Sequence, residues 1–440
     1  MTDLRTRFQT LDRLSAPDLW DSIEERAMAL QPAPRRTPWL LVAVMLLLTL
    51  IVGGALLVGS GLIKLPAVVD ASASPSASAD ASALASSSPV EPVPASWTAT
   101  GDMVEARTFH TATQLLDGRI LVAGGVGTDT SEFFANILAS AELYDPVSGS
   151  WTATGSMLGI RTGHAATLLP DGKVLVMGGG SSSDGDGGPL ATAEVYDPAT
   201  GAWTATGNTI GAGPGRTATL LGNGRVLVTG GATSDFEPLA LAELYDPSTG
   251  AWTATPDMVE ARSGHTATLL LDGKVLVAGG LTAELYDPAT GLWTATGAPL
   301  GFSTGHTATL LNDGRVMVAG GMAGTGARSG AEIYDPGTGQ WTATGTMVDG
   351  RIYHSATLLP GGLVLVTGGT NSVIDGGEAV ASAELYDSAT GSWTVTVSMS
   401  VSRGGNTATL LRVGKVLVAG GSGAGGYLAS AELYDPGSGS

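Results

Sequence analysis

Two hydrophobic patterns divide this chain. Residues 39–63 carry no charge and are dominated by Leu, Val, Ala and Gly, and this stretch is long enough for a helix that crosses a bilayer. From Trp97 onward the apolar residues come instead in short runs that return about every fifty residues. The returning motifs are Trp-Thr-Ala-Thr, His-Thr-Ala-Thr-Leu-Leu, Arg/Lys-Val-Leu-Val-x-Gly-Gly and Ala-Glu-Leu-Tyr-Asp-Pro, with tryptophans at 97, 151, 203, 252, 293, 341 and 393. Such a period indicates a unit that buries its apolar faces against copies of itself.

Each unit predicts four strands. In the unit that begins at Gly163, residues 164–169 are small and apolar. Residues 173–177 are apolar on both faces, as expected for a strand that lies between neighbouring sheets. Residues 193–196 and 203–206 supply the third and fourth strands, and the fourth is expected to be outermost.

The residues between these strands predict tight turns. Asp171-Gly172 predicts a two-residue hairpin turn with positive φ angles. The Gly178-Gly179 doublet lacks Cβ atoms and allows another backbone to come close. Residues 197–201, Asp-Pro-Ala-Thr-Gly, predict a turn in which Asp binds the downstream backbone and Gly accepts left-handed geometry.

Four antiparallel strands repeated around an axis form a β-propeller. The Gly-Gly doublet, the Tyr-Asp pair and the Trp at this spacing resemble the kelch repeat over residues 96–440. The resemblance implies an all-β, seven-bladed kelch propeller like the central domain of galactose oxidase, and it implies little about function. The repeats begin with an isolated fourth strand, residues 97–100, and end after a third strand at 434–436. We therefore expect strand 97–100 to join the C-terminal blade and to close the ring, which removes exposed sheet edges.

Charges beside the apolar segment predict its orientation. Arg35 and Arg36 precede it and a lone Lys64 follows, so the positive-inside rule places the N-terminus in the cytoplasm. A cleavable signal peptide fits less well, because 36 residues would precede its apolar core. We expect four segments: a cytoplasmic tail (1–36), a transmembrane helix (37–64), an Ala/Ser/Pro-rich linker (65–95) and a kelch propeller (96–440). The protein would cross the cell membrane once, with its propeller on the extracytoplasmic side.

Composition excludes several kinds of chemistry. From Ser96 onward the chain has 31 acidic and 14 basic residues, and this surface would repel nucleic acid. Cysteine is absent, so neither a disulfide nor a cysteine-ligated metal is available. Galactose oxidase uses a copper site with a Cys–Tyr cross-link, and that site does not carry over to a chain without cysteine. We expect no cofactor and no metal site; Asp184-Gly-Asp186-Gly resembles only the start of a calcium loop.

The predicted connections between strands differ on the two rims of the ring. Turns between strands 1 and 2, and between strands 3 and 4, are short and uniform. The connections between strands 2 and 3 (2–3) and from strand 4 to the next strand 1 (4–1) share the other rim. Spacers between Gly-Gly and Ala-Glu are 15, 13, 10, 2, 9, 13 and 9 residues long. Recognition usually resides in variable loops on a rigid scaffold.

The aromatic residues outside the repeated Trp and Tyr positions all fall on this 2–3/4–1 rim. Together with nearby acidic residues they predict a surface that binds a protein or a glycan. An alternative is that some rings only pack their own loops. The predicted rim residues are Phe109, Glu132, Phe133, Phe134, Asp184, Asp186, Asp235, Phe236, Phe302, Tyr353, Asp375, Glu378 and Tyr427.

Histidine and arginine recur at fixed repeat positions. They are expected to ring the mouth of the central channel, or else to form polar links, Arg with Glu among them, that hold the blades together. A glutamate recurs in every third strand, at 142, 194, 243, 284, 332, 384 and 432. The predicted channel-mouth residues are Arg107, His110, Arg161, His164, Arg262, His265, His306, Arg351, His354 and Arg403.

These features favour a membrane-anchored, extracytoplasmic kelch propeller that binds a protein or carbohydrate and has no catalytic residues. One alternative is an extracytoplasmic sugar-modifying enzyme, epimerase-like or lyase-like, with Arg, His and Glu at the channel mouth. Another is a transmembrane sensor that signals to the tail at 1–36.

Overall fold

The computed structural model describes residues 93–128, 136–181, 188–280, 282–299, 301, 304–324, 326–372 and 377–437. All regular elements in these ranges are β-strands, as the all-β prediction required. Across the ranges searched, no helix has the length and hydropathy needed to cross a membrane. The predicted tail at 1–36 and the predicted transmembrane helix at 37–64 lie outside the described residues.

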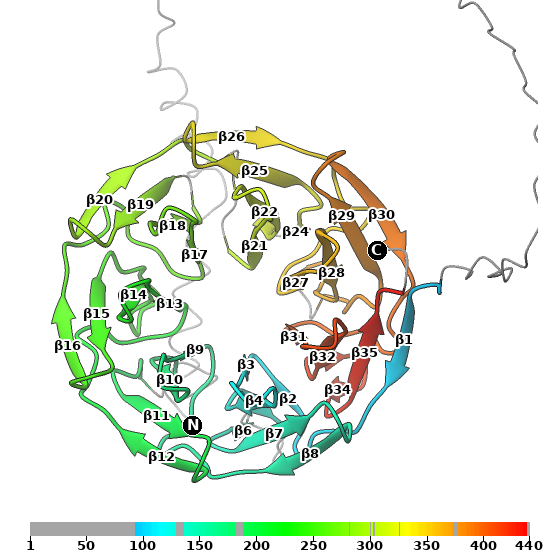
Figure 1. Cartoon of the computed structure of the whole chain (residues 1–440), viewed down its shortest axis with the longest axis horizontal. Coiled ribbons are helices and arrows are strands. Elements are labelled where there is room, and N and C mark those ends of the chain that lie inside the picture. Colours follow the sequence, from blue (N-terminus) through cyan, green and yellow to red (C-terminus); the bar gives the residue numbers. More distant parts are fainter. Residues whose placement is uncertain are drawn as a thin grey trace, which may run out of the picture. The chain divides into compact units, whose positions relative to one another are not determined.

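Seven four-stranded antiparallel sheets are present in the described part of the chain, arranged around one axis (Figure 1). Three of them, from inner to outer strand, are β3(Thr111–Gln114)-β4(Ile120–Ala123)-β7(Ala141–Asp145)-β8(Ser150–Ala153), β9(Ala165–Leu168)-β10(Val174–Met177)-β11(Ala193–Asp197)-β12(Ala202–Ala205) and β13(Arg216–Leu220)-β14(Val226–Gly230)-β15(Ala242–Asp246)-β16(Ala251–Ala254). The next three are β17(Thr266–Leu269)-β18(Val275–Ala278)-β19(Ala283–Asp287)-β20(Leu292–Ala295), β21(His306–Leu310)-β22(Val316–Gly320)-β25(Ala331–Asp335)-β26(Gln340–Ala343) and β27(Ser355–Leu358)-β28(Leu363–Thr367)-β29(Ala383–Asp387)-β30(Ser392–Thr396).

The seventh sheet is formed by both ends of the repeat region. Its order is β31(Thr407–Leu410)-β32(Val416–Ala419)-β35(Ala431–Asp435)-β1(Ser96–Ala99). Strand β1 runs antiparallel to β35, with Ser96 opposite Asp435 and Ala99 opposite Glu432. The innermost strands are neighbours all the way around, including β31 and β3 (Figure 1). The outer edge of β35 is therefore paired within the chain.

Apolar second strands fill the space between neighbouring sheets. Strand β10 is fully buried along its length, as predicted from a run that is apolar on both faces. One core cluster joins Leu121 and Leu143 of one sheet to Val174 and Val176 of the next. The cores therefore lie between sheets, so that no sheet buries its apolar residues alone.

The repeated Trp and Tyr connect each sheet to the one before it. Tyr144 and Trp151 pack together with ring centroids 5.0 Å apart. The Trp151 Nε1–H donates to the Gly101 carbonyl oxygen at 2.8 Å, and the Tyr144 hydroxyl is 2.9 Å from Thr100 Oγ1. Both partners belong to the segment after β1, in the preceding sheet. Each outer strand is thus fixed by rings and by hydrogen bonds.

The rim that carries the short 1–2 and 3–4 turns is called the uniform rim. Its 3–4 turns agree with the prediction and its 1–2 turns differ from it. In the 3–4 turn, Asp197 Oδ1 accepts the Ala199 N–H at 2.9 Å and Gly201 has φ 71°. For the 1–2 turn, the prediction of a two-residue Asp-Gly hairpin is wrong. The Gly172 N–H donates to Leu169 O and the Leu169 N–H to Lys173 O, so a longer turn closes with positive φ only at Gly172.

The 2–3 connections form small ribbons on the opposite rim. They are β5(Val126–Gly127) and β6(Asn136–Ile137), which are joined by β2(Arg107–Thr108) of the preceding 4–1 connection, the pair β23(Met322–Ala323) and β24(Gly326–Ala327), and the pair β33(Ser422–Gly423) and β34(Gly426–Tyr427). Backbone bridges also join 2–3 to 4–1 connections, for example Leu239 to Arg262. This rim is therefore tied together by its own backbone.

Candidate functional site

A buried ion pair lies inside most of the sheets, close to the 2–3/4–1 rim. In the second sheet, Arg161 Nη2 is 2.5 Å from Glu194 Oε1, and neither side chain is more than 3% exposed. The same glutamate accepts the N–H groups of Leu158 at 2.6 Å and Gly159 at 3.2 Å. Six such pairs occur in the described residues: Arg107–Glu142, Arg161–Glu194, Arg216–Glu243, Arg262–Glu284, Arg351–Glu384 and Arg403–Glu432.

The role of these pairs is to fasten the 4–1 connection to the sheet it enters. Arg161 Nη1 also donates to the carbonyl oxygens of Gly178 and Thr192. The carboxylate and the guanidinium thus hold backbone from the 4–1 connection, the second strand and the 2–3 connection together. In the closing sheet, burial raises the pKa of Glu432, but the Ser400 N–H and Arg403 outweigh it and leave that pKa below its usual value.

The third sheet forms its ion pair from a different repeat position. The residue that corresponds to Arg161 is Gly213, and the residue that corresponds to His164 is Arg216. Arg216 Nη2 lies 2.5 Å from Glu243 Oε1, and Arg216 Nη1 donates to the Gly211 carbonyl oxygen at 2.7 Å. In the sequence, Arg216 occupies the position that histidine takes in five of the other six units. In the structure it performs the work of the missing arginine.

The histidines link the innermost strands of neighbouring sheets. His164 Nε2 is 3.0 Å from Thr111 Oγ1 of the preceding sheet, and His354 Nε2 is 2.9 Å from Thr307 Oγ1. In the closing sheet, Asn406 takes the histidine position and its Nδ2 donates to Ser355 Oγ at 3.3 Å. These Thr and Ser partners were missed from the sequence, although a Thr or Ser follows four of the five repeated histidines.

The glycine doublets leave the space that these rings need. A Cβ placed on Gly124 would lie 2.8 Å from His164 Cε1 and 2.7 Å from the Arg161 carbonyl oxygen. Burial, followed by the Arg161 charge, lowers the pKa of His164 to about 3. The pKa values of His110, His265 and His354 are also lowered to about 3, and that of His306 to about 4, in each case mainly by burial.

These placements differ from an open ring of charges at a channel mouth. The five predicted arginines are 0–3% exposed and the five histidines 5–7% exposed. The arginine Nη atoms and the histidine Nε2 atoms contact protein atoms of their own or the adjacent sheet. The structure thus places Arg107, His110, Arg161, His164, Arg262, His265, His306, Arg351, His354 and Arg403 where they connect backbone and strands, inaccessible to a ligand in solution.

The described aromatic residues of the predicted rim lie on the 2–3 and 4–1 connections. Phe109 and Tyr353 lie two residues before the innermost strands β3 and β27, and they are 44% and 37% exposed. Phe236 lies in the 2–3 connection before β15 and is 74% exposed, while Tyr427 ends β34 and is half-buried. The neighbouring Asp235 and Glu378 are exposed. The other predicted rim residues, Glu132, Phe133, Phe134, Asp184, Asp186, Phe302 and Asp375, lie outside the described residues.

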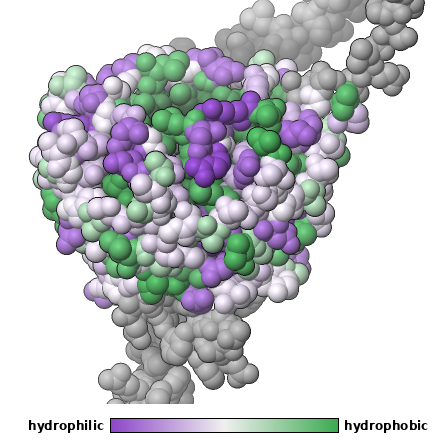
Figure 2. Space-filling view, turned by 60° about the horizontal axis from the view of Figure 1, so that its bottom comes forward, coloured by the Kyte–Doolittle hydropathy of each residue, from purple (hydrophilic) through white to green (hydrophobic). Residues whose placement is uncertain are grey.

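Exposed aliphatic side chains add to this rim and were not predicted. They occupy one position of the 4–1 connection, and the backbone N–H of each donates to the buried glutamate of the sheet it enters. The residues are Val104, Leu158, Ile210, Val259 and Val348, each 57–77% exposed. Figure 2 shows hydrophobic and hydrophilic residues interleaved over the visible face. The sequence signal was a recurring aliphatic residue before the arginine.

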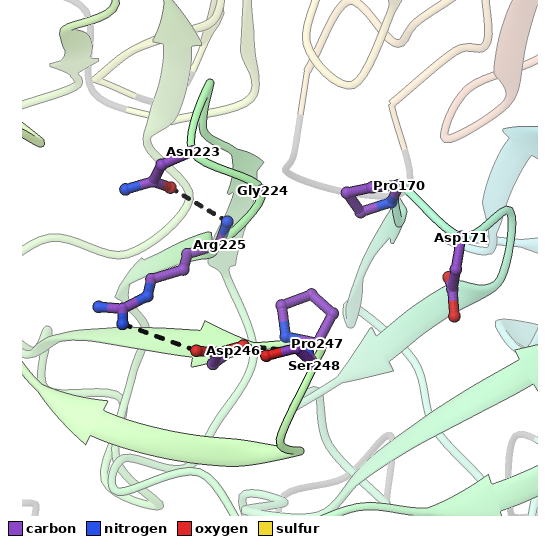
Figure 3. Close-up of a pocket in the computed structure, with 8 residues that line it drawn as sticks. All are labelled: Pro170, Asp171, Asn223, Gly224, Arg225, Asp246, Pro247 and Ser248. Carbon is purple, nitrogen blue, oxygen red and sulfur yellow. Dashed lines mark hydrogen bonds and ion pairs between the residues drawn. The ribbon is translucent and has the colours of Figure 1, made fainter.

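The structure also has a cavity of about 500 Å³ on the uniform rim, between the second and third sheets (Figure 3). Its walls are turn residues: Pro170 and Asp171 of one sheet, and Asn223, Arg225 and Asp246 of the next. Arg225 Nη2 lies 3.6 Å from Asp246 Oδ2 across the cavity wall. Because these residues belong to turns that the repeat uses in every sheet, the cavity follows from the packing of neighbouring turns. We place the candidate site on the other rim, where the sheets differ.

Comparison with known proteins agrees with this architecture. The kelch motif model matches residues 107–158, 161–208, 304–348 and 351–400. An F-box/kelch-repeat protein of Arabidopsis thaliana is 34% identical over 26% of this chain and 28% of its own length. Kelch-like protein 34 of Homo sapiens is 33% identical over 23% of this chain and 15% of its own length. The chain therefore contains kelch repeats, and it spans less than a third of these curated relatives.

Solved structures show the same fold. A fungal alcohol oxidase of the AA5 family, in complex with copper, aligns with a TM-score of 0.64 and 21% identity, over 78% of this chain and 76% of its own. The structure of YjhT aligns with a TM-score of 0.52 and 17% identity, over 67% of this chain and 99% of its own. The described residues thus form a β-propeller built from kelch repeats.

The residues of this chain do not fit a copper site of that kind. The chain has no cysteine, and the described residues contain no group of three or more His, Asp or Glu side chains arranged to hold a metal. The histidines point their Nε2 atoms at hydroxyl groups between sheets, one histidine to an interface. We derive no metal chemistry from the likeness.

Proposed function

We propose that this chain is a membrane-anchored, extracytoplasmic, seven-bladed kelch propeller that binds a protein or a carbohydrate through its 2–3/4–1 rim and is not an enzyme. Kelch repeats generally mediate protein interactions, and the repeats matched here are of this family. The observation that carries the proposal is that the exposed aromatic residues gather on this rim, beside the exposed aliphatic residues of the 4–1 connections. Interfaces draw most of their binding energy from such side chains.

The placement of the polar repeat residues supports binding over catalysis. A sugar-modifying enzyme would need arginine, histidine or glutamate groups that a substrate can reach. Arg107, Arg161, Arg351 and Arg403 are 0% exposed, and their guanidinium groups are paired with glutamate. Turnover of any member of a glycan panel by the purified full-length chain would favour the enzyme instead.

Binding can be tested on the full-length protein in detergent. The double variant Phe236→Gly/Tyr427→Ser removes one exposed and one half-buried ring from the 2–3 connections, and we expect it to lower retention of a captured partner by about tenfold or more, as for interface hot spots. The matched control is Val147→Ala on the uniform rim, where the side chain is 96% exposed. Undiminished retention by the rim variant would contradict the proposal.

The absence of cysteine makes the predicted orientation simple to measure. A cysteine introduced by Val147→Cys would be the only thiol in the chain. We expect a membrane-impermeant maleimide to label it in intact cells, and to label a Ser15→Cys variant only after the cells are opened. Labelling of Ser15→Cys alone in intact cells would reverse the proposed orientation. Loss of a cellular response on deletion of residues 1–36 would favour the sensor alternative.

A further inference from the structure

Seven residues form a collar around the axis, one at the start of each innermost strand. Each directly precedes the repeated histidine position, and each has a φ angle between 52° and 73°. At six of the seven junctions a backbone N–H donates to the carbonyl oxygen of the neighbouring member, as from Phe109 to Gly405 and from Gly405 to Tyr353. The members are Phe109, Gly163, Gly215, Gly264, Gly305, Tyr353 and Gly405.

Two members of this collar are aromatic where the other five are glycine. Positive φ is free of steric cost for glycine and strained for a bulky residue. Phe109 and Tyr353 flank Gly405, and their rings meet edge to face with centroids 5.3 Å apart. A Cβ on Gly405 would be 3.3 Å from Phe109 Cε1, so this glycine makes room for the contact. A strained pair that persists in a repeated fold points to a use other than packing.

The solvent exposure of the two rings also indicates a use other than packing. The repeated tyrosines, such as Tyr144 and Tyr196, are 0% exposed and belong to the cores. Phe109 and Tyr353 instead keep 44% and 37% of their surface in solvent. The pair is therefore an aromatic surface held beside the axis by backbone hydrogen bonds between neighbouring collar members.

The connections that hold the two rings carry excess negative charge. Arg107, two residues before Phe109, contacts both Glu142 at 2.6 Å and Glu105 at 3.6 Å. Arg351, two residues before Tyr353, likewise contacts Glu384 at 2.9 Å and Asp349 at 3.7 Å. Each guanidinium is buried between two carboxylates. The side chains of Glu105 and Asp349 are 45% exposed, so each connection presents a net negative charge to solvent.

We propose that the Phe109–Tyr353 pair receives a cationic side chain, arginine or lysine, of the partner protein. A cation over an aromatic face is attracted by the ring quadrupole, and the exposed carboxylates on the connections that carry the two rings add to this attraction. A neutral sugar could stack on the rings and donate hydroxyl hydrogen bonds to Glu105 and Asp349, but it would carry no charge for these carboxylates to attract. The inference rests on the proposed function and specifies the chemistry of its partner.

The test compares two peptides that differ only in charge, Ac-Gly-Arg-Gly-NH2 and its citrulline analogue. Binding to the full-length protein is measured by ligand-observed NMR in 0.3 M NaCl, where exposed charges are screened beyond about 6 Å. We expect the arginine peptide to bind about threefold to fivefold more tightly, the size of an exposed cation–π contact. The preference should vanish in Phe109→Gly/Tyr353→Gly and persist in the control Val147→Ala.

Thermal unfolding separates recognition from packing. Because five of the seven collar members are glycine, the double glycine variant should unfold at the same or a higher temperature. A lower Tm would mean that the rings are packing elements, and the proposal would be overturned. The double variant Glu105→Gln/Asp349→Asn should bind the arginine peptide more weakly than the wild type and should bind the citrulline peptide equally well.

Other outcomes are also decisive. Equal binding of both peptides would indicate a neutral ligand such as a glycan, and no binding of either by the wild type would remove the site. If Phe236→Gly/Tyr427→Ser releases the captured partner while the peptides bind equally, the rim function holds and this inference fails. If the partner stays bound to every rim variant, the proposed function itself fails.

Discussion

Single residues of this propeller adopt conformations that only their neighbours explain. Phe109, Phe236 and Tyr353 have φ angles of 52°, 62° and 55°, which bulky residues seldom adopt. Two of them belong to the collar and contact each other. Phe236 is different, because it is 74% exposed and its backbone N–H closes a local turn onto Thr233 O. Its ring contributes little to the core.

Replacing Phe236 by glycine therefore tests strain directly. The left-handed conformation costs a non-glycine residue about 1–2 kcal/mol, and glycine loses about 0.5–1 kcal/mol in extra backbone entropy. We expect Phe236→Gly to raise the free energy of unfolding by about 0.5–1 kcal/mol. Urea denaturation followed by tryptophan fluorescence would measure it. A destabilised variant would show that the ring packs its own loop, the alternative to recognition.

Elements are joined by groups that the repeat places at fixed positions. Each buried Arg–Glu pair holds the incoming 4–1 connection, as in Glu194 with the N–H groups of Leu158 and Gly159. The third sheet shows that the requirement is for the guanidinium and not for its position, since Arg216 reaches Glu243 from the histidine position.

Because Arg216 provides the guanidinium of the third sheet, replacing it by the histidine of the other units should destabilise the protein. In Arg216→His the buried Glu243 would lose its guanidinium partner, which costs about 3–5 kcal/mol in the free energy of unfolding. Adding Gly213→Arg should not rescue it, because Gly213 has φ 119° and a Cβ there would overlap the Ala232 carbonyl oxygen. Denaturant unfolding of both variants would check this. Recovery in the double variant would contradict the account.

The whole ring depends on contacts that cross from sheet to sheet. Strand β1 completes the sheet of β35, and Trp97 Nε1–H donates to the Val397 carbonyl oxygen at 2.7 Å across that closing interface. Between the innermost strands, histidines repeat this crossing at most interfaces. Since they are buried and neutral, the ring as a whole responds to acid.

The sign of this response follows from the lowered pKa values. His164 titrates near 3 when folded and near 6.5 when unfolded, so the unfolded chain binds more protons between these values. The contribution of neutral His164 to the free energy of unfolding is complete above about pH 6.5 and falls as the pH drops toward 3. Lowered pKa values of Asp246 and Asp387, caused first by the Ser248 hydroxyl and the Ala389 N–H respectively, act in the same direction in more acidic solution.

Replacing one histidine should flatten this dependence. Asn406 shows that asparagine fits the position, so His164→Asn should fold. Between pH 7 and 5 we expect the variant to lose about 2 kcal/mol less unfolding free energy than the wild type. Urea titrations at both pH values would measure the difference. An unchanged pH dependence would show that His164 is not the responsible group.

Much of this architecture was predictable from local pattern. The four strands of each unit, the buried second strand and the Asp-Pro turn follow from apolar runs and turn chemistry, and the structure contains them. The incomplete units at the two ends predicted the pairing of β1 with β35. The prediction for the 1–2 turn was wrong because the Asp-Gly pair alone does not reveal how many residues the turn contains.

The candidate site was predictable only in part. Exposed aromatic residues outside the repeat positions indicated the correct connections for Phe109, Phe236, Tyr353 and Tyr427. For the polar repeat residues the sequence left two interpretations open, a ring at the channel mouth and links between the blades, because burial depends on neighbours from other sheets. A recurring Arg or His looks the same in sequence whether it faces solvent or a carbonyl group.

The amino-acid sequence by itself determined the repeated unit, its strands and the joining of its ends, because these depend on periodicity and on residues close together in the chain. Only the tertiary structure decided that the histidines and arginines are internal links, that Arg216 replaces a missing arginine, and that Phe109 meets Tyr353 across Gly405. These facts arise from contacts between sheets far apart in the chain, and no local pattern encodes which side chains meet there.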